Sequence, residues 1–282
     1  VHSEGRYTRA RPMKTSVTSL HYAVLGLANV LLAAPAVLDP AAFRPYVERF
    51  NKVFPEQVVN AIPDSRAWDW IAANVPLFEC PDKEVEELYY YRWWAYRKHI
   101  KQTPKGFILT EFLKPVSHAT EYNAISCALG HHVYEGRWLH EPAYVDQYLR
   151  FWLQGGPGGT LHPALHNYSA WVADAVMARW LVDARTYFAT SLLDALLTDF
   201  RAWEKERRLP CGLFWQYDVR DGIEESASGS RTARNIRPTI NSYMYGNAVA
   251  LAKLCRLAGR QVQAQEFEQE AQRLRHLVQE KL

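Results

Sequence analysis

The sequence lacks features that several classes of protein require. Its 282 residues include only four cysteines, which are far apart and form no C-x-x-C pair, so the spacing of a zinc site is absent. The formal net charge is only +3, and basic residues are interspersed with acidic ones, which argues against a nucleic-acid-binding protein. No low-complexity tract or long charge run indicates disorder. With 48% hydrophobic and 22% charged residues, the chain should fold around a buried core.

The sequence also has no hydrophobic run long enough for a transmembrane helix. Its apolar run at residues 22–34 is too short to span a bilayer. A basic stretch from Met13 precedes it, and Ala34-Pro35-Ala36 follows, which is the pattern of a signal peptide with a cleavage site. We therefore predict export to the periplasm or outside the cell, with no membrane association after cleavage. A buried helix is the alternative, and Asn29 within the run favours it.

Export would permit disulfide bonds between the four cysteines. Cys127 and Cys255, however, fall on apolar stripes of predicted helices, a position typical of buried thiols. Both alternatives remain open at this point.

From residue 41 onward, hydrophobic periodicity predicts one helix after another. The predicted helices are residues 41–53, 65–73, 83–102, 123–139, 143–153, 168–182, 187–207, 242–258 and 261–282. Residues 106–113 alternate like a short extended segment, and long connections at 154–163 and 209–238 are rich in Gly, Pro, Ser and charge. Helices that are apolar all round alternate with amphipathic ones, which suggests an inner and an outer layer. We predict an all-α fold of helical hairpins, an α/α toroid; no repeat typical of a solenoid is present.

Aromatic residues are abundant: ten Trp, sixteen Tyr and eleven Phe make up 13% of the chain. Most such side chains fill cores. They also provide flat surfaces for the C–H faces of sugars, and composition does not choose between the two roles.

The densest group of acidic residues lies in residues 215–230. Asp218, Asp221, Glu224 and Glu225 fall within eight residues, beside two aromatic residues and Arg220. Carboxylates held close together repel one another when all are ionised, so the pKa of one should rise. A carboxylic acid that protonates a glycosidic oxygen needs such a raised pKa. Calcium binding by clustered oxygens is one alternative, although no EF-hand pattern is present. A solvated loop is the other.

A second group lies near a predicted helix end. Glu135, Arg137 and Trp138 could bind sugar hydroxyls and stack on a ring, or form an internal ion pair that only stabilises the helix. His131 and His132 lack a convincing metal partner at the i+4 position, so we predict no metal site.

A third group comprises His166, Tyr168, Trp171 and Asp174. Trp171 and Asp174 share a helical stripe with apolar residues, so Asp174 should face inward. A buried carboxylate must be paired or line a cavity, and both interpretations are open.

A fourth group, at the start of the helix predicted over 242–258, contains Asn241 and Tyr243. Asn241 or Ser242 could cap that helix, or these side chains could bind a sugar. The predicted sugar-binding residues are thus Glu135, Arg137, Trp138, His166, Tyr168, Trp171, Asp174, Trp215, Arg220, Glu225, Asn241 and Tyr243.

Several segments together resemble bacterial six-hairpin glycosidases, the relatives of glycoside hydrolase family 63, trehalases and mannosylglycerate hydrolases. They are VERFN from Val47, YYYRWWAYRKHIKQTP from Tyr89, GHHVYEGRWL from Gly130, DGIEESASGS from Asp221 and RPTINSYMYGNA from Arg237. The resemblance covers roughly residues 40–282.

The resemblance implies an (α/α)6 toroid that hydrolyses glycosides with inversion, using one acid and one base carboxylate. Glu224 stands where the family commonly has its acid, an Asp, and Asp221 is the alternative because the longer Glu side chain shifts the carboxyl. The family's base lies in the last hairpins. The final helix stays in register to Leu282 without a stop signal. We therefore expect a toroid that is incomplete at its C-terminal end, lacks its general base and is inactive alone.

On this basis, residues 1–36 form an upstream extension with a signal peptide, and residues 37–282 form the N-terminal part of a toroid glycosidase domain. The substrate is a carbohydrate, and no cofactor is expected apart from the calcium alternative. Two other functions remain open. A toroid lyase or sugar epimerase would abstract a proton with His131, His132, His166 or Tyr168, and a non-catalytic toroid would only bind sugar.

Overall fold

The computed structural model describes residues 38–222 and 231–282. The proposed signal peptide, the boundary at residue 36, Glu224 and Glu225 lie outside the described residues. Within the described residues, no helix is long and apolar enough to cross a membrane.

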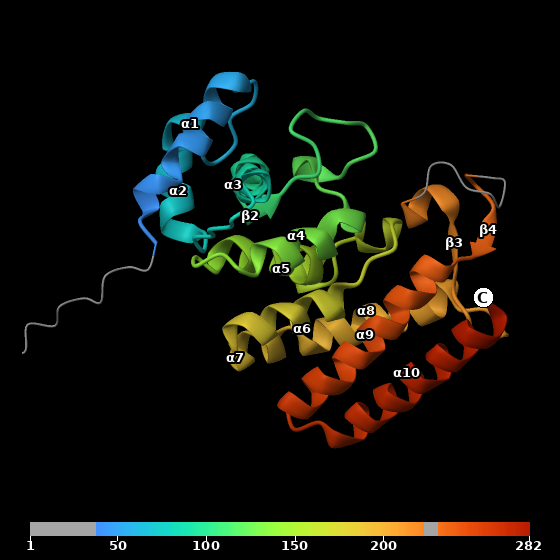
Figure 1. Ribbon diagram of the computed structural model, residues 1–282. Helices are drawn as coiled ribbons and strands as arrows, with labels where there is room; N and C mark the ends of the chain where they lie inside the picture. Colours follow the sequence, from blue (N-terminus) through green and yellow to red (C-terminus); the bar gives the residue numbers. More distant parts are fainter. Residues whose placement is uncertain (1–37, 223–230) are drawn as a thin grey trace, which may run out of the picture. The chain divides into compact units, whose positions relative to one another are not determined.

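Helices make up most of the described chain, and two short β-hairpins accompany them (Figure 1). The helices are α1 (Arg44–Val53), α2 (Ala67–Asn74), α3 (Lys83–Lys98), α4 (Leu129–Gly136), α5 (Ala143–Gln154), α6 (Val172–Asp183), α7 (Thr186–Ser191), α8 (Leu193–Arg207), α9 (Pro238–Leu257) and α10 (Gln261–Lys281). The antiparallel strand pairs are β1 (Ile100–Thr103) with β2 (Gly106–Leu109), and β3 (Trp215–Tyr217) with β4 (Arg234–Ile236). The fold is therefore all-α and built of helical hairpins, as predicted.

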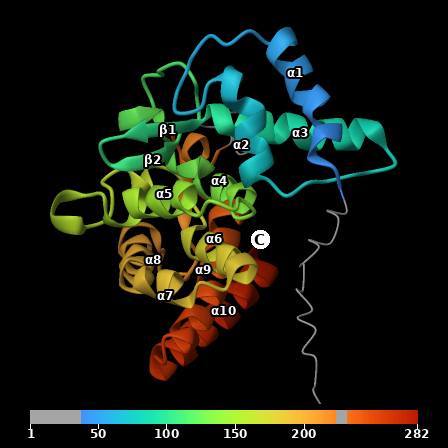
Figure 2. The ribbon, with the colours of Figure 1, turned by 90° about the vertical axis from the view of Figure 1, so that its left-hand side faces the viewer.

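The helices form two layers. In one layer, α4 packs on α6, and α6 packs on α9. In the other layer, α5 packs on α8, while α10 folds back along α9 as a hairpin (Figures 1 and 2). The mostly apolar helices α6 and α9 bury residues on nearly all sides, whereas α10 buries only one face. Alternating apolar and amphipathic helices thus produce the inner and outer layers that the sequence suggested.

Helix α3 is shorter than predicted. Asp82 caps it by accepting hydrogen bonds from the backbone N–H groups of Glu84 and Val85. The helix ends at Lys98, not at residue 102, because the chain turns into the β1–β2 hairpin. The segment predicted as extended supplies β2, and residues Ile100, Ile108 and Leu109 are buried in this hairpin.

The prediction of one helix over residues 123–139 was wrong in its first half. Two 3₁₀ turns, Glu121–Asn123 and Ser126–Ala128, precede α4. Asn123 adopts a left-handed conformation (φ 64°), which Asn tolerates. Its amide group bonds to the backbone of Phe112, Lys114 and Val116. The hydrogen bonds of the Asn123 side chain therefore stabilise a non-helical conformation in the segment before α4.

Two polar side chains near helix starts do not act as helix caps. The carboxylate of Asp64 pairs with Arg97 and Lys98 of α3 and does not cap α2. Helix α9 begins at Pro238, so Asn241 lies inside its first turn. Gly259, by contrast, ends α9 with the left-handed conformation (φ 74°) expected of a glycine after a helix.

The four cysteines, all within the described residues, form no disulfide bond, and Cys255 is buried in the core. That core includes large side chains from many elements; Trp152, Trp203, Tyr90, Tyr148 and Phe200 are fully buried.

Candidate functional site

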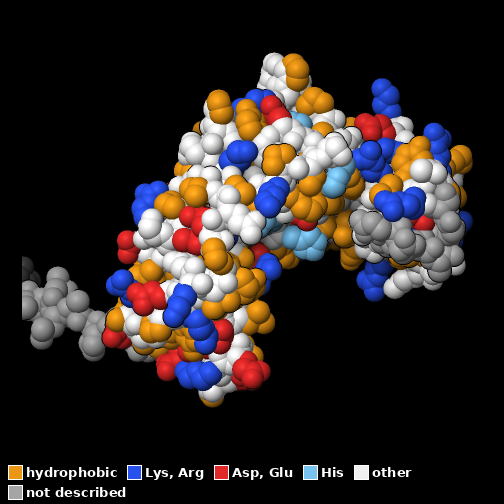
Figure 3. Space-filling model, turned by 90° about the horizontal axis from the view of Figure 1, so that it is seen from above, with side chains coloured by type: hydrophobic (Ala, Val, Ile, Leu, Met, Phe, Trp, Pro, Cys, Tyr) orange, Lys and Arg blue, Asp and Glu red, His pale blue; other side chains and the backbone are white. Residues whose placement is uncertain are grey.

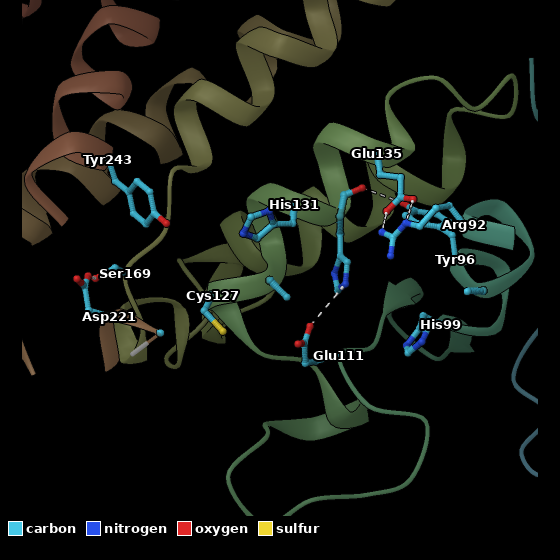
Figure 4. Close-up of a pocket in the computed structure, with 14 residues that line it drawn as sticks. Arg92, Tyr96, His99, Glu111, Cys127, His131, Glu135, Ser169, Asp221 and Tyr243 are labelled. Atoms are coloured by element: carbon cyan, nitrogen blue, oxygen red, sulfur yellow. Dashed lines mark hydrogen bonds and ion pairs between the residues drawn. The ribbon is translucent and has the colours of Figure 1, made fainter. Parts of the chain in front are cut away.

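Two adjoining cavities lie among helices α3, α4, α6 and α9. The first has a volume of about 500 Å³ and the second about 630 Å³. They share four lining residues: Arg92, His131, Glu135 and Tyr243. Figure 4 shows the first cavity, with Asp221 and Tyr243 on one side and Glu111, His99 and Arg92 on the other. Together the two cavities form one continuous candidate active site.

Asp221 lies in the wall of the first cavity. It ends the 3₁₀ turn Asp218–Asp221, and only 6% of its surface is exposed. Its Oδ1 accepts a hydrogen bond from Ser169 Oγ at 2.6 Å, and its Oδ2 lies 3.6 Å from Arg237 Nε. Burial raises the pKa of Asp221 above its usual value, although hydrogen bonds from Ser169 and Thr239 and the charge of Arg237 oppose this. Asp221 therefore stays protonated at a higher pH than an ordinary Asp.

The turn that carries Asp221 is fixed by buried polar contacts. Asp218 accepts hydrogen bonds from Asn235 and Arg237 at 3.0 and 2.9 Å. The backbone N–H of Ser169 donates to the carbonyl of Arg220 at 3.0 Å. These bonds join the 3₁₀ turn to β4 and to the start of α6, which pre-organises the Asp221 carboxyl.

A second carboxyl group, that of Glu111, lines the same cavity. Its backbone N–H donates to the carbonyl of Asn123, so the irregular segment before α4 sets its position. Burial raises the pKa of Glu111, and the charge of His131 opposes the rise. Glu111 Oε2 lies 3.8 Å from Nε2 of His132, whose pKa burial lowers to about 3, so His132 is neutral. The cavity thus contains two carboxyl groups with raised pKa values.

Glu135 differs from these two because an arginine contacts both of its carboxylate oxygens. Arg92 of α3 donates to both of its carboxylate oxygens, at 3.2 and 2.7 Å. A bidentate ion pair holds a carboxylate in a fixed orientation. Glu135 and Arg92 therefore supply fixed polar groups at the junction of the two cavities.

Aromatic rings form the wall of the second cavity. The ring of Trp171 lies 4.5 Å from that of Tyr243, and His131 packs edge-on against Trp171, also at 4.5 Å. Tyr134 donates a hydrogen bond to Asp174, which together with burial raises the pKa of Tyr134 to about 12. Flat rings beside polar acceptors are features that suit a sugar ring and its hydroxyls.

The structure brings five of the sequence-predicted residues together in the cavities. They are Asp221, Glu135, Trp171, Asp174 and Tyr243. For Asp174, pairing and cavity lining were both open. Its carboxylate accepts a hydrogen bond from Tyr134, and it also lines the second cavity.

The other described candidates do not line these cavities. Arg137 stacks over Tyr134 and Trp138. His166 pairs with Asp199 and Glu206, and Asn241 is fully buried, bonding to the backbone of Phe214. Tyr168, Trp215 and Arg220 belong to aromatic–arginine contacts near β3.

Sequence reasoning missed Arg92, His99 and Glu111. Arg92 was hidden in the aromatic run of α3, and Glu111 follows a short strand as an isolated carboxylate between apolar residues. Neither local pattern indicates a site. Contacts of α3 with α4 and the backbone bond from Glu111 to Asn123 bring these residues to the cavity. Within the described residues, no group of three His, Cys, Asp or Glu side chains could hold a metal ion.

Helical hairpins around an aromatic-lined cavity with buried carboxyl groups define a glycosidase-like domain of the six-hairpin class. The chain belongs to the family of the mannosylglycerate hydrolase MGH1-like glycoside hydrolase domain, whose model matches residues 121–282. A solved structure described as a sialidase is similar at 48% sequence identity, with a TM-score of 0.83 over 86% of this chain. This chain covers 22% of that sialidase chain. No curated protein matches the chain.

Proposed function

We propose that this domain hydrolyses a glycosidic bond of an oligo- or polysaccharide with inversion of configuration, and that Asp221 is its general acid. Membership of a glycoside hydrolase family indicates the reaction class. The observation that carries the proposal is the buried carboxyl of Asp221 in the cavity wall, with its raised pKa and its hydrogen bond from Ser169.

In this mechanism, Asp221 donates its proton to the oxygen of the scissile glycosidic bond. A water molecule, deprotonated by a second carboxylate, attacks the anomeric carbon from the opposite face. The bond to the leaving group breaks, and a hemiacetal of inverted configuration forms. Glu224, the other acid candidate, lies outside the described residues, so the two require separate tests.

The base must be a carboxylate roughly 6.5–9.5 Å from the acid, leaving room for that water. The resemblance assigns this role to a Glu in hairpins that follow those of this chain. On that proposal the 282 residues bind sugar but do not turn it over without the rest of the toroid. Among the described residues, Glu111 is the carboxylate of the first cavity that no arginine pairs with.

The acid can be tested by replacing Asp221 with Asn in the longest form of the protein that hydrolyses glycosides. A general acid contributes roughly 10²–10⁴-fold, so we expect a loss of that size on glycosides with a poor leaving group. 2,4-Dinitrophenyl glycosides need no protonation, and their hydrolysis should be largely retained. Asp194→Asn, on the exposed surface of α8, is the matched control.

Full activity of the Asp221→Asn variant on both kinds of substrate would reject Asp221. The same pair of measurements on Glu224→Gln would then assign the acid. If no form of the wild-type protein hydrolyses glycosides, yet sugar binds, the domain is a carbohydrate-binding toroid.

The lyase or epimerase alternative has less support. Of its four candidate bases, His166 and Tyr168 do not line the two cavities, and the pKa of His132 is too low for an effective base. An unsaturated product that absorbs in the ultraviolet would nevertheless identify a lyase.

A further inference from the structure

A group of arginines surrounds two aromatic rings at the β3–β4 hairpin. The guanidinium carbon of Arg207, the last residue of α8, lies 4.3 Å from the centre of the Trp215 ring. That of Arg234 on β4 lies 4.6 Å from the same ring. Arg207 also lies 5.7 Å from the ring of Tyr217. Figure 3 shows Lys and Arg side chains gathered at the end of the molecule where this hairpin lies.

These arginines differ from their neighbours because, among the described residues, no carboxylate forms an ion pair with them. Arg208, the residue after Arg207, pairs with Glu204 and Glu270. In the described part of the chain, Arg207, Arg220 and Arg234 form no ion pair. The nearby carboxylate of Glu206 is instead held by His166.

The electrostatic consequence is a local excess of positive charge. Arg207 Nε is a buried donor with no hydrogen-bond partner among the described residues. Burial lowers the pKa of Arg207, and the charges of Arg234 and Arg220 lower it further, against the opposing charge of Glu206. A hydrogen bond from Arg234 and the charge of Arg207 lower the pKa of Tyr217. Such a cluster is costly unless an anion offsets it.

The cluster adjoins the candidate acid. Arg220 precedes Asp221 in the same 3₁₀ turn and lies 4.8 Å from the ring of Tyr168, which precedes Ser169. Ser169 and Asp221 line the first cavity, whereas Tyr168 and Arg220 do not. The residues that line the cavity and those of the arginine cluster are therefore direct neighbours along the chain.

We propose that Arg207, Arg220 and Arg234 bind an oxyanion, a carboxylate or a sulfate, carried by the glycan substrate. The planar guanidinium group donates two parallel hydrogen bonds to such groups, which a neutral sugar cannot replace. Trp215 and Tyr217 supply faces for the ring that carries the anion. The inference rests on the proposed function, because it makes the substrate an acidic glycan whose charged unit lies beside the sugar that is cleaved.

The test measures binding by calorimetry with four probes: glucuronate, glucose 6-sulfate, glucose and inorganic sulfate. We expect an acidic sugar to bind, glucose to bind more weakly, and about 0.5 M NaCl to weaken the binding of the acidic sugar by screening. A preference for glucuronate or for glucose 6-sulfate identifies which oxyanion the site takes.

Arg207→Gln and Arg234→Gln should each weaken binding of the acidic sugar at least about tenfold, since a hydrogen bond to a charged group contributes about 1.5–3 kcal/mol. Arg275→Gln, an exposed residue of α10 that forms no ion pair with the described residues, is the control and should bind as the wild type does. Thermal unfolding of each variant checks that it folds.

Equal affinity for glucose and glucuronate, no binding of either acidic sugar, or binding that the Arg207 and Arg234 variants leave unchanged would overturn the inference. Binding of inorganic sulfate alone would also overturn it. Hydrolysis of neutral aryl glycosides without binding of acidic sugars would refute only this inference, whereas binding of acidic sugars without any hydrolysis would refute only the proposed function.

Discussion

At the scale of single residues, the partners of a histidine decide its charge. The ring of His166 lies between two carboxylates, with Nε2 2.7 Å from Asp199 and Nδ1 3.1 Å from Glu206. Burial alone would lower the pKa of His166, but the hydrogen bonds and charges of these two carboxylates raise it overall. His132 is buried, and its Nε2 lies 3.8 Å from the Glu111 carboxylate, beyond hydrogen-bond distance; its pKa changes in the opposite direction. Although His166 was predicted to bind sugar, its contacts here are those of an ion-pair network between the loop before α6 and α8.

This network predicts a pH-dependent stability. Because the pKa of His166 is raised in the folded state, its contribution is fully present below the unfolded-state pKa of about 6.5 and is lost as the pH rises through the folded-state pKa. His166→Gln should therefore lower the free energy of unfolding more at about pH 5.5 than at about pH 9, as measured by urea unfolding. His276→Gln, an exposed residue on α10, should have little effect at either pH. An equal loss at both pH values for His166→Gln would contradict the ion-pair assignment.

At the scale of helices, close contact between α4 and α6 positions the aromatic wall of the second cavity. A methyl group on Gly130 of α4 would overlap the indole ring of Trp171. The same indole packs at a tilt against the ring of Tyr243 of α9. A glycine at this one position of α4 therefore lets three helices approach around the cavity.

Gly130→Ala should destabilise the protein by about 1–3 kcal/mol through overpacking and displace Trp171. Gly246→Ala is the matched control: it lies within α9, and its added methyl would only reach ordinary contact, 3.9 Å from Asp174. The control should be neutral or stabilising by up to about 1 kcal/mol, because alanine favours helix. Thermal unfolding measures both changes, and near-ultraviolet circular dichroism reports on Trp171. If Gly130→Ala were as stable as the control, this packing argument would be wrong.

At the scale of the whole described chain, buried charges join the N-terminal loops to α3. Arg97 is fully buried; it pairs with Asp64 and donates to the carbonyl of Ile62 at 2.7 Å. Lys98 reaches the same Asp64 oxygen at 2.8 Å. Burial would raise the pKa of Asp64, but the hydrogen bonds and charges of Lys98 and Arg97 lower it overall.

Asp64→Asn would leave Arg97 and Lys98 with only the more distant carboxylate of Glu56, at 3.9 and 4.0 Å, which should cost up to about 3–5 kcal/mol of unfolding free energy. Because the pKa of Asp64 is lowered in the folded state, its contribution is present above the unfolded-state value of about 3.9 and is lost as the pH falls through the folded-state pKa. The difference between wild type and variant should therefore shrink on acidification. Asp194→Asn, in an exposed ion pair, should cost at most about 1 kcal/mol. Chemical unfolding across the pH range decides between these outcomes.

Much of the architecture could be predicted from local pattern. Hydrophobic periodicity located α5, α9 and α10 to within a few residues, because the apolar residues of a long helix recur in every turn and form a regular pattern in the sequence. The C-terminal end of α3 and the start of α4 were misplaced, since a β-hairpin sets the first and the hydrogen bonds of Asn123 set the second, and neither leaves a periodic signal.

The sequence by itself determined the helical class of this protein, the concentration of carboxylates that includes Asp221, and the family resemblance. Only the tertiary structure decided which polar residues meet. It brought Arg92 and Glu111 to the cavity, placed His166 and Asn241 in structural contacts, and gathered arginines at the β3–β4 hairpin. The physical reason is the distance along the chain over which each feature forms. Helix periodicity involves residues a few positions apart, whereas a cavity forms between segments that are distant in the sequence. Burial of the Asp221 carboxyl in the wall of that cavity raises its pKa.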